Sequence, residues 1–330
     1  MKRFLTLLTT TPWPVPTAIA VLLGVGVLLG VGVGHLFKGH RLTPSVEVHS
    51  DAPYVGDDRN GPQVFVPNER EALAVPTPKT PPAEPPPSGG VKPAWQRFAV
   101  SFHPSPGKPM IAVVIDDLGL DKRRTRRAID LPPPLTMAFL TYAEDLPTQT
   151  AMAHQHGHEL LVHMPMQAIS DHFNAGPNVL EVGMSADELH HRIDWGLDRF
   201  TGYVGVNNHM GSRFTADPQG MSVVMQSLKQ RGLLFLDSIT TDSSAAPEAA
   251  QKIGVPLIQR QVFLDNEQTL EAIREQLAKT EAIARHHGSA IAIGHPHDST
   301  ITALADWLPT LEAKGFMIVP VTAIMKESQK

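Results

Sequence analysis

From Lys108 to the C-terminus the chain alternates short apolar runs with segments of helical periodicity, and this alternation restricts the fold more than any other feature. The apolar runs have the length of strands and are Met110–Ile115, Leu135–Leu140, Glu159–His163, Tyr203–Val206, Leu233–Leu236, Ser289–Ile293 and Phe316–Val319. Strands that alternate with helices form a largely parallel sheet whose faces the helices cover. We therefore expect residues 108–330 to form one α/β domain, either as an open sheet or as a barrel.

Two of the intervening segments carry clear helix signals. The first opens with a capping box, Ser185 to Glu188, and then repeats apolar residues at helical spacing. The second begins at a candidate N-cap, Asn266, and ends at Gly288, a residue type that commonly follows a helix. Both segments are predicted to be helices that pack on the sheet.

The N-terminal third differs in composition and is not expected to build a packed core. Residues 1–16 form a short flank, and residues 17–37 form an apolar run without a formal charge that is long enough to span a bilayer. A cleaved signal peptide is the alternative, but the run exceeds the usual hydrophobic region of a signal peptide and no obvious A-x-A cleavage site follows it. We expect a retained transmembrane anchor at 17–37.

Residues 38–107 are rich in proline and are predicted to be a flexible, extended linker. The sequence TPKTPPAEPPPSGG within this linker favours polyproline II geometry. Such a linker could hold the domain away from a membrane, and its PxxP-like sequences could recruit protein partners of the envelope. The extended-spacer interpretation is the favoured one.

Composition excludes several classes of function. The 28 basic residues face 33 acidic ones, for a net charge of −5, so the chain has no broad cationic field for nucleic acid. No glycine-rich phosphate loop follows the first strand, so we expect no nucleotide. The chain has no cysteine and no G-x-S-x-G motif, which excludes thiolate ligands and gives no support to a serine hydrolase. Any bound metal must be held by His, Asp or Glu.

Carboxylates and imidazoles follow five of the expected strands. In chain order these polar residues are Asp116, Asp117, His163, Asn207, Asn208, His209, Asp237, His295 and His297. Each one alone could be a helix cap or a structural histidine. Because parallel strands end at the same edge of a sheet, we expect them to lie together and to form a site. Carboxylates and imidazoles without thiolates suit hydrolysis of an amide or ester by a catalytic divalent metal, and zinc is the ion we expect.

Five motifs at these positions together resemble the divergent polysaccharide deacetylase family, a distant branch of the NodB-like carbohydrate esterases. The motifs are IAVVIDDLG, GHELLVHMPMQ, GVNNHMGSRFT, LLFLDSITTDSS and IAIGHPHDS, within residues 109–325. The resemblance implies a distorted (β/α) barrel that removes N-acetyl or O-acetyl groups from an envelope polysaccharide with a divalent metal. Together with the apolar run at 17–37, it predicts a single-pass protein of the inner membrane whose domain lies on the periplasmic side.

The resemblance also implies roles for the residues around the metal. Asp116 would be the general base toward the attacking water, and Asp117 and His163 would be metal ligands. The classical enzymes carry a second ligand histidine four residues after the first, and Gln167 stands at that position here. We therefore expect His209 to supply the third ligand.

The remaining site residues follow from the same resemblance. The general acid that protonates the leaving amine would be His295 or His297, and His295 is the first choice because it directly follows its strand. Asp237 would orient that imidazole or bind the sugar. Asn208, Arg213 and Gln167 are candidates for polar contacts with the glycan.

Two alternatives remain open at this point. Because Gln167 replaces a ligand histidine, the domain could bind metal weakly, or bind glycan as a scaffold without hydrolysing it. The basic run DKRRTRR at 121–127 is interpreted as a solvated loop and helix face; steering of an anionic substrate toward the site is the less favoured interpretation.

Overall fold

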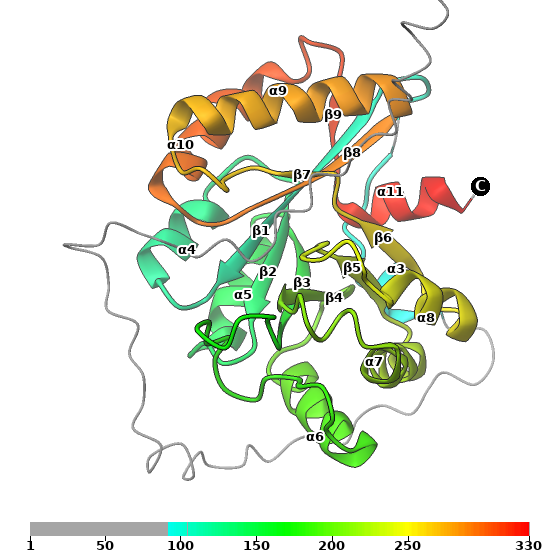
Figure 1. Ribbon diagram of the computed structural model, residues 1–330. Coiled ribbons are helices and arrows are strands. Elements are labelled where there is room, and N and C mark those ends of the chain that lie inside the picture. Colours follow the sequence, from blue (N-terminus) through cyan, green and yellow to red (C-terminus); the bar gives the residue numbers. More distant parts are fainter. Residues whose placement is uncertain (1–91, 104, 330) are drawn as a thin grey trace, which may run out of the picture. The chain divides into compact units, whose positions relative to one another are not determined.

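The computed structural model describes residues 92–103 and 105–329. The predicted flank at 1–16, the anchor at 17–37 and the linker up to residue 91 lie outside the described residues. Among the residues described, no helix combines the length and the apolar character needed to cross a membrane. Figure 1 shows the described residues as a ribbon coloured along the sequence.

The described part of the chain is organised around a nine-stranded sheet in which every pairing is parallel. The strand order is β6-β5-β4-β3-β2-β1-β8-β7, with β9 paired to β1. The strands are β1 (Met110–Leu118), β2 (Thr136–Leu140), β3 (Glu159–Met166), β4 (Gly205–Met210), β5 (Leu234–Asp237), β6 (Leu257–Gln259), β7 (Val262–Phe263), β8 (Ser289–Gly294) and β9 (Met317–Ile318). All seven predicted strands are present, as the alternation of apolar runs and helices required.

The sheet curls into a half-barrel because its two edge strands belong to one short segment of chain. β6 pairs with β5 and β7 pairs with β8, and only Arg260 and Gln261 separate them. The Arg260 amide donates to the carbonyl of Asp237 (3.1 Å), whereas the Gln261 amide donates to the carbonyl of Ile291 (2.9 Å). This segment therefore bridges the two sides of the curled sheet.

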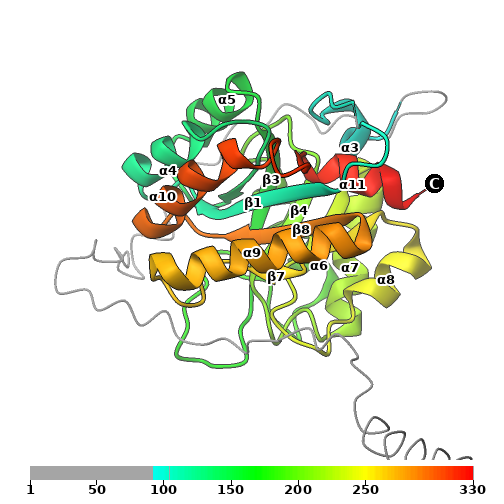
Figure 2. The ribbon, with the colours of Figure 1, turned by 90° about the horizontal axis from the view of Figure 1, so that it is seen from above.

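Helices cover the outer face of the sheet, as Figures 1 and 2 show. They are α3 (Ala94–Arg97), α4 (Lys122–Ile129), α5 (Leu146–Gln155), α6 (Ala186–Leu197), α7 (Pro218–Arg231), α8 (Ala246–Ile253), α9 (Leu270–His287), α10 (Asp298–Trp307) and α11 (Val321–Ser328), with a 3₁₀ turn at Leu308–Thr310. The last of these, α11, and the short α3 lie at one end of the sheet rather than on its outer face.

The predicted helix boundaries are confirmed in two of three cases. The Ser185 side chain caps α6 by accepting from the Glu188 amide (3.2 Å), and Gly288 ends α9 with a φ of 84°. The predicted N-cap Asn266 is wrong, because Thr269 caps α9 by accepting from the Ala272 amide (3.2 Å). A hydroxyl at 269 satisfies the free amides of the first turn, so the helix starts later than expected.

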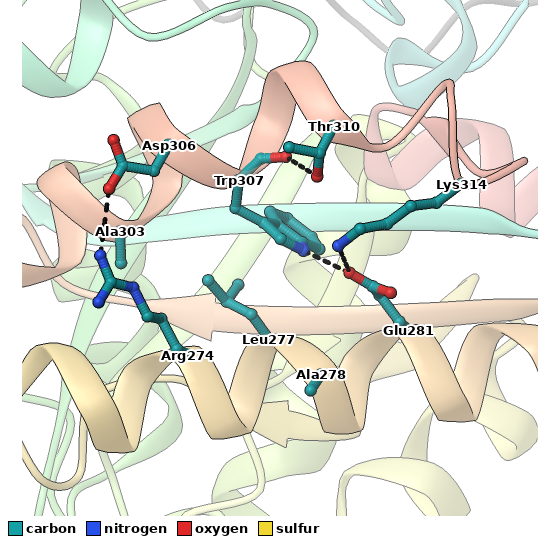
Figure 3. A pocket seen from close by; sticks show the side chains of 9 residues that line it. All are labelled: Arg274, Leu277, Ala278, Glu281, Ala303, Asp306, Trp307, Thr310 and Lys314. Atoms are coloured by element: carbon teal, nitrogen blue, oxygen red, sulfur yellow. Dashed lines mark hydrogen bonds and ion pairs between the residues drawn. The ribbon is translucent and has the colours of Figure 1, made fainter.

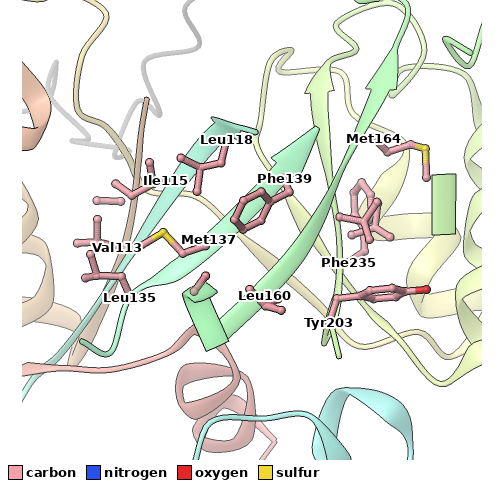
Figure 4. Packing of buried hydrophobic residues seen from close by; sticks show 14 of the residues in the cluster. Val113, Ile115, Leu118, Leu135, Met137, Phe139, Leu160, Met164, Tyr203 and Phe235 are labelled. Carbon is pink, nitrogen blue, oxygen red and sulfur yellow. The ribbon is translucent and has the colours of Figure 1, made fainter. Parts of the chain in front are cut away.

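Two apolar clusters fill the two sides of the sheet. On β1, Ile111, Val113 and Ile115 belong to the cluster between the sheet and the outer helices, while Ala112 and Val114 face the inside of the curl. Figure 4 shows the outer cluster, in which fully buried side chains from β1, β2 and β3 pack together. A strand with apolar residues on both faces is typical of a parallel sheet with covered faces.

The inner cluster is closed at the amino ends of the strands, called here the amino edge. Trp95 of α3 is 3% exposed, and it packs in the inner cluster with residues of α11 such as Ile324. The Trp95 amide donates to the carbonyl of Gly232 (3.0 Å). The folded part of the chain therefore includes α3, and the predicted domain start at Lys108 is too late for this segment.

Candidate metal and catalytic site

The carboxyl ends of β1, β3, β4 and β8, called here the carboxyl edge, bring the predicted metal and catalytic residues together. Asp117 lies at the centre of this group. Its Oδ1 atom is 2.9 Å from His209 Nδ1 and 3.2 Å from His163 Nε2, and its Oδ2 atom is 3.8 Å from His295 Nε2. Residues separated by up to 178 positions in sequence thus lie close together, because their strands run parallel within one sheet and end at the same edge.

A local distortion of β1 places two successive carboxylates on the same imidazole. Successive residues of a regular strand point to opposite faces, yet Asp116 Oδ2 (3.7 Å) and Asp117 Oδ1 (3.2 Å) both approach His163 Nε2. The pairing register of β1 with β2 shifts between Ile115 and Leu118, and Asp117 has a φ of 55°. A non-glycine residue in this conformation is strained, and such strain concentrates at functional sites.

The atoms around Asp117 have the composition of a cation site. One carboxylate oxygen and two imidazole nitrogens, from Asp117, His163 and His209, lie within 4.8 Å of one another. Asp117 Oδ1 is buried and accepts no hydrogen bond of acceptable geometry, although both imidazoles approach it. Burial raises the pKa of Asp117, but the His209 and His163 imidazoles outweigh burial and hold that pKa well below its ordinary value. The residues present therefore fit a divalent cation.

Asn207 fixes the tautomer that His163 needs as a ligand. The Asn207 amide nitrogen donates to both oxygens of Asp116 (2.9 and 3.0 Å), so its carbonyl oxygen faces His163 Nδ1 at 2.9 Å. His163 Nδ1 therefore carries a proton, and when the ring is neutral its Nε2 lone pair points toward Asp117. Burial lowers the pKa of His163, but Asp116 and Asp117 outweigh burial and raise it. Partners of this kind orient metal-binding histidines and raise their affinity. The sequence placed Asn207 at a strand end without assigning it a role.

His295 is held by a carboxylate that sequence reasoning missed. Asp265 Oδ1 lies 3.0 Å from His295 Nδ1, while its Oδ2 accepts from the His295 amide (2.6 Å) and from the Thr300 hydroxyl (2.8 Å). Burial lowers the pKa of His295, but Asp265 and the neighbouring aspartates outweigh it and raise that pKa to about 10. Asp265 follows the apolar run VFL just as Asp237 follows LFL, a strand-end signal that could have revealed it.

Asp237 does not hold the His295 imidazole, which was one of its two predicted roles. It is fully buried and accepts from the Ile239 amide (2.9 Å) and the Gln259 side chain (3.4 Å), so the carboxylate on His295 is that of Asp265. Arg260, also buried, donates to the carbonyls of Ser238 (2.7 Å) and Ile239 (2.8 Å) in the same loop. Asp237 and Arg260 therefore shape the loop after β5, which in turn touches Asn207 through the Ser238 hydroxyl (3.3 Å).

The three predicted glycan-contact residues hold the loops around the site in this structure. Gln167 accepts from the Val182 amide (3.0 Å), and Arg213 donates to the carbonyl of Ile169 (2.6 Å). The Asn208 carboxamide oxygen accepts from the Ser238 amide (2.9 Å), and its nitrogen donates to the carbonyl of Met210 (2.7 Å). Their contact with glycan stays a prediction.

His297 lies beside the predicted acid. Its ring centroid is 5.8 Å from that of His295, and it forms a second group of possible ligands with Asp265 and His295. Both oxygens of Asp265 already accept hydrogen bonds, so this group is organised around the Asp265–His295 contact. Burial is the main cause that lowers the pKa of His297. These two pKa shifts are consistent with a neutral His297 beside a charged His295.

A cavity of about 320 Å³ lies away from the carboxyl edge, between α9 and α10 (Figure 3). Its charged groups satisfy one another: Glu281 accepts from the Trp307 indole (2.7 Å) and from Lys314 (2.6 Å), and Arg274 pairs with Asp306 (3.3 Å). None of the residues gathered around Asp117 lines it. This cavity is therefore separate from the site at the carboxyl edge.

Comparisons with known proteins find relatives that match the described domain. Residues 113–325 match the profile of a family described as divergent polysaccharide deacetylase. The uncharacterised protein YibQ of Escherichia coli K12 is 36% identical over 219 residues, which are 66% of this chain and 68% of that protein. The crystal structure of the uncharacterised protein ATU2773 from Agrobacterium tumefaciens C58 is similar with a TM-score of 0.70 and 31% identity, covering 73% of this chain and 99% of that one.

Proposed function

The chain belongs to the divergent polysaccharide deacetylase family, and from that premise we propose that it is a metal-dependent hydrolase that removes acetyl groups from an amino sugar of an envelope glycan. The observation that carries the proposal is the convergence of the His163 and His209 imidazoles on the buried Oδ1 atom of Asp117. These three residues would hold the cation. When bound, a cation such as zinc polarises the acetyl carbonyl and makes a nearby water more acidic.

Asp116 is placed to take a proton from the attacking water. Burial raises the pKa of Asp116 despite the opposing effects of His163 and His295, which makes the carboxylate a stronger base than an exposed aspartate. Asn207 holds both of its oxygens, so the carboxylate cannot rotate away from His163. The sequence expectation that Asp116 acts as general base is therefore kept as part of the proposal.

His295 is placed to return a proton to the leaving amine. Its Nδ1 atom is held by Asp265, so Nε2 is the nitrogen that faces Asp117 and the reacting group. With a pKa of about 10, the ring carries its proton at neutral pH. The water hydroxyl joins the acetyl carbon first, as its proton passes to Asp116. The C–N bond then breaks as a proton moves from His295 Nε2 to the amine, and the acetyl group leaves as acetate.

The metal-dependence test uses full-length protein and two readouts, metal content and acetate release from an N-acetylated oligosaccharide. Asp117→Asn should lose both, because it weakens the central ligand. Asp130→Asn, an exposed aspartate paired with Arg126, is the control and should keep both. Wild-type protein that carries no metal and releases no acetate would overturn the proposal, as would full activity in Asp117→Asn.

The alternative, a glycan-binding scaffold without turnover, rests on Gln167. In the structure this side chain holds the Val182 amide and takes no part in the ligand group, whereas His209 supplies the second imidazole. A scaffold would bind N-acetylated oligosaccharide equally well with and without a chelator and in Asp116→Asn. A hydrolase would lose acetate release under both conditions.

We further propose that residues 17–37 anchor the protein in the inner membrane, with the domain on the periplasmic side and residues 38–91 as a spacer. The support is the length of the uncharged apolar run and the proline content that follows it. Fractionation of full-length protein, compared with a chain that lacks residues 1–41, tests the anchor. Equal release of both chains into the soluble fraction would contradict it.

A further inference from the structure

Three arginines of α4 converge on a single carboxylate at the start of α10. Arg123 Nη2 (3.7 Å) and Arg124 Nη2 (3.5 Å) approach Asp298 Oδ2, and Arg127 pairs with Asp298 Oδ1. We call Arg123, Arg124 and Arg127 the arginine cluster. Its members are partly or largely exposed, with 66% of the Arg123 side chain and 37% of the Arg127 side chain accessible to solvent.

The arginine cluster lies next to the candidate site. α4 follows β1 and α10 follows β8, and these two strands are parallel neighbours, so both helices begin at the carboxyl edge. Figures 1 and 2 show α4 and α10 side by side. Asp298, the residue on which the cluster converges, is separated from His295 by Pro296 and His297 alone. The arginine cluster therefore lies at the same edge of the sheet as the candidate site, around a carboxylate a few residues beyond His295.

The cluster carries more positive charge than a structural tie requires. One exposed carboxylate needs one guanidinium to join α4 to α10, and exposed ion pairs add little stability. The α4 segment 121–130 together with Asp298 holds five cations and three carboxylates. The amino end of α10 adds a further positive dipole at Asp298. The net charge of these residues at the rim of the site is positive, although the net charge of the whole chain is negative.

We infer that the arginine cluster binds an anionic group of the substrate, so that the glycan this site acts on is an acidic polysaccharide. The inference rests on the proposed function for the identity of the site. Guanidinium groups match carboxylate and phosphate oxygens with paired hydrogen bonds, and either group on a sugar next to the reacting one would serve. Asp298 holds the three side chains together while leaving the cluster cationic.

The test compares three oligosaccharides on full-length protein: a neutral N-acetylglucosamine hexamer, the same hexamer oxidised to carry 6-carboxylates, and one that carries 6-phosphates. Dissociation constants are measured by calorimetry with chelator present, so binding does not depend on turnover. We expect at least one acidic hexamer to bind roughly tenfold or more tightly than the neutral one, as one or two charge-assisted hydrogen bonds would give. Which acidic hexamer binds tightly identifies the anionic group.

The double substitution Arg123→Glu with Arg127→Glu should abolish this preference and leave binding of the neutral hexamer unchanged. The matched control, Lys122→Glu with Arg126→Glu, changes the charge of the same helix equally on positions that do not contact Asp298, and it should keep the preference. High salt should weaken the acidic hexamers selectively.

Equal affinity of wild type for all three hexamers would overturn the inference, as would an equal loss of preference in the control. Acetate release, measured in parallel without chelator, separates the two proposals. If acidic hexamers bind selectively but none releases acetate, the proposed activity fails and the anion site stands. If the neutral hexamer is deacetylated as well as the acidic ones and the arginine substitutions change nothing, only the anion site fails.

Discussion

Asp117 at the carboxyl edge and Glu159 at the amino edge are two carboxylates whose pKa values move in opposite directions. At the carboxyl edge, Asp117 faces two imidazoles, and its pKa falls well below the ordinary value. At the amino edge, Glu159 is 1% exposed and accepts from the Thr322 amide (3.0 Å), the Thr322 hydroxyl and the Val100 amide (3.3 Å). These neutral donors do not compensate for burial, which raises the pKa of Glu159 to about 7.

Backbone geometry separates the edges in the same way. Asp117, Met210 and Ile239 have φ values of 55°, 53° and 47°, and all three lie at or just after the carboxyl ends of their strands. At the amino edge, Glu159 begins a regular strand that pairs with β2 without a register shift. Burial alone therefore does not define a functional site. The functional edge combines imidazole partners with strained backbone, whereas the structural edge offers neutral hydrogen-bond donors.

The largest expected effect is on the functional edge, in His295→Gln. Glutamine can still donate to Asp265 but holds no proton for the leaving amine, so kcat/KM for acetate release should fall by about 10²–10⁴-fold. The control is His190→Gln, because His190 bonds the Ser227 hydroxyl (3.0 Å) on the outer helices. Activity within a few-fold of wild type in His295→Gln would remove the distinction between the edges.

The next effect concerns the structural edge and the pH dependence of stability. Because burial raises the pKa of Glu159 from 4.5 to about 7, the folded state binds more protons than the unfolded chain between these values. The free energy of unfolding should therefore fall as the pH rises from 4.5 through about 7, by on the order of 3 kcal/mol. Below pH 4.5 the group is protonated in both states and this loss is absent.

Glu159→Gln cannot ionise, so its free energy of unfolding should lack this decline. Urea denaturation of full-length protein between pH 4.5 and pH 8 measures the difference between wild type and variant. Glu188→Gln, an exposed glutamate on α6, is the control and should follow wild type. Parallel curves for wild type and Glu159→Gln would show that neutral donors suffice to stabilise the ionised carboxylate.

A smaller effect is expected for Asn207→Leu at the functional edge. The change removes the acceptor that holds the His163 Nδ1 proton, so zinc affinity should fall by about 10–100-fold. Competition with a chelating dye measures it. Ser238→Ala removes another contact of the same amide (3.3 Å) without touching His163, and its zinc affinity should stay near wild type. An equal loss in both variants would contradict the role assigned to Asn207.

The smallest effect is expected for Thr322→Val at the structural edge. Valine keeps the shape and the backbone donor but removes one hydroxyl from Glu159, which should cost about 1 kcal/mol of unfolding free energy at pH 8. Acetate release should not change. Thr302→Val, whose hydroxyl bonds only the Asp298 carbonyl of its own helix (2.7 Å), provides the control. Loss of activity in Thr322→Val would couple the two edges.

Much of the fold was predictable because its signals are local. Apolar runs of strand length predicted seven of the nine strands in the described part of the chain, including the two-residue β9, and Ser185 predicted the start of α6. β6 and β7 escaped prediction because the polar residues Gln259, Arg260 and Gln261 interrupt the apolar run there, whereas β9 lies within the continuous run Phe316–Val319. Trp95 lay in a segment interpreted as linker, and only its packing with α11 reveals that it is folded.

The candidate site was predictable in its types of residue but not in its contacts. Asp117, His163 and His209 meet as expected, because strand ends of a parallel sheet converge. Asp265 was missed because the short run VFL before it was not predicted to be a strand. The role of Asp237 beside His295 came from the resemblance to the family, and the structure gives that role to Asp265. Which carboxylate reaches His295 depends on how β7 lies against β8, a pairing that no local pattern encodes.

Residue patterns alone show that this chain has a parallel α/β domain, that carboxylates and imidazoles follow its strands, and that any metal must be held without thiolates. Three features became visible only in the folded chain: Asp116 and Asp117 share one imidazole, Asn207 sets the His163 tautomer, and the arginines of α4 converge beside the site. The two groups of features differ in how far apart the interacting residues lie in sequence. Periodicity and strand ends are properties of neighbouring residues, whereas the Asn207–Asp116 contact joins positions 91 residues apart and depends on strand order and a single strained φ.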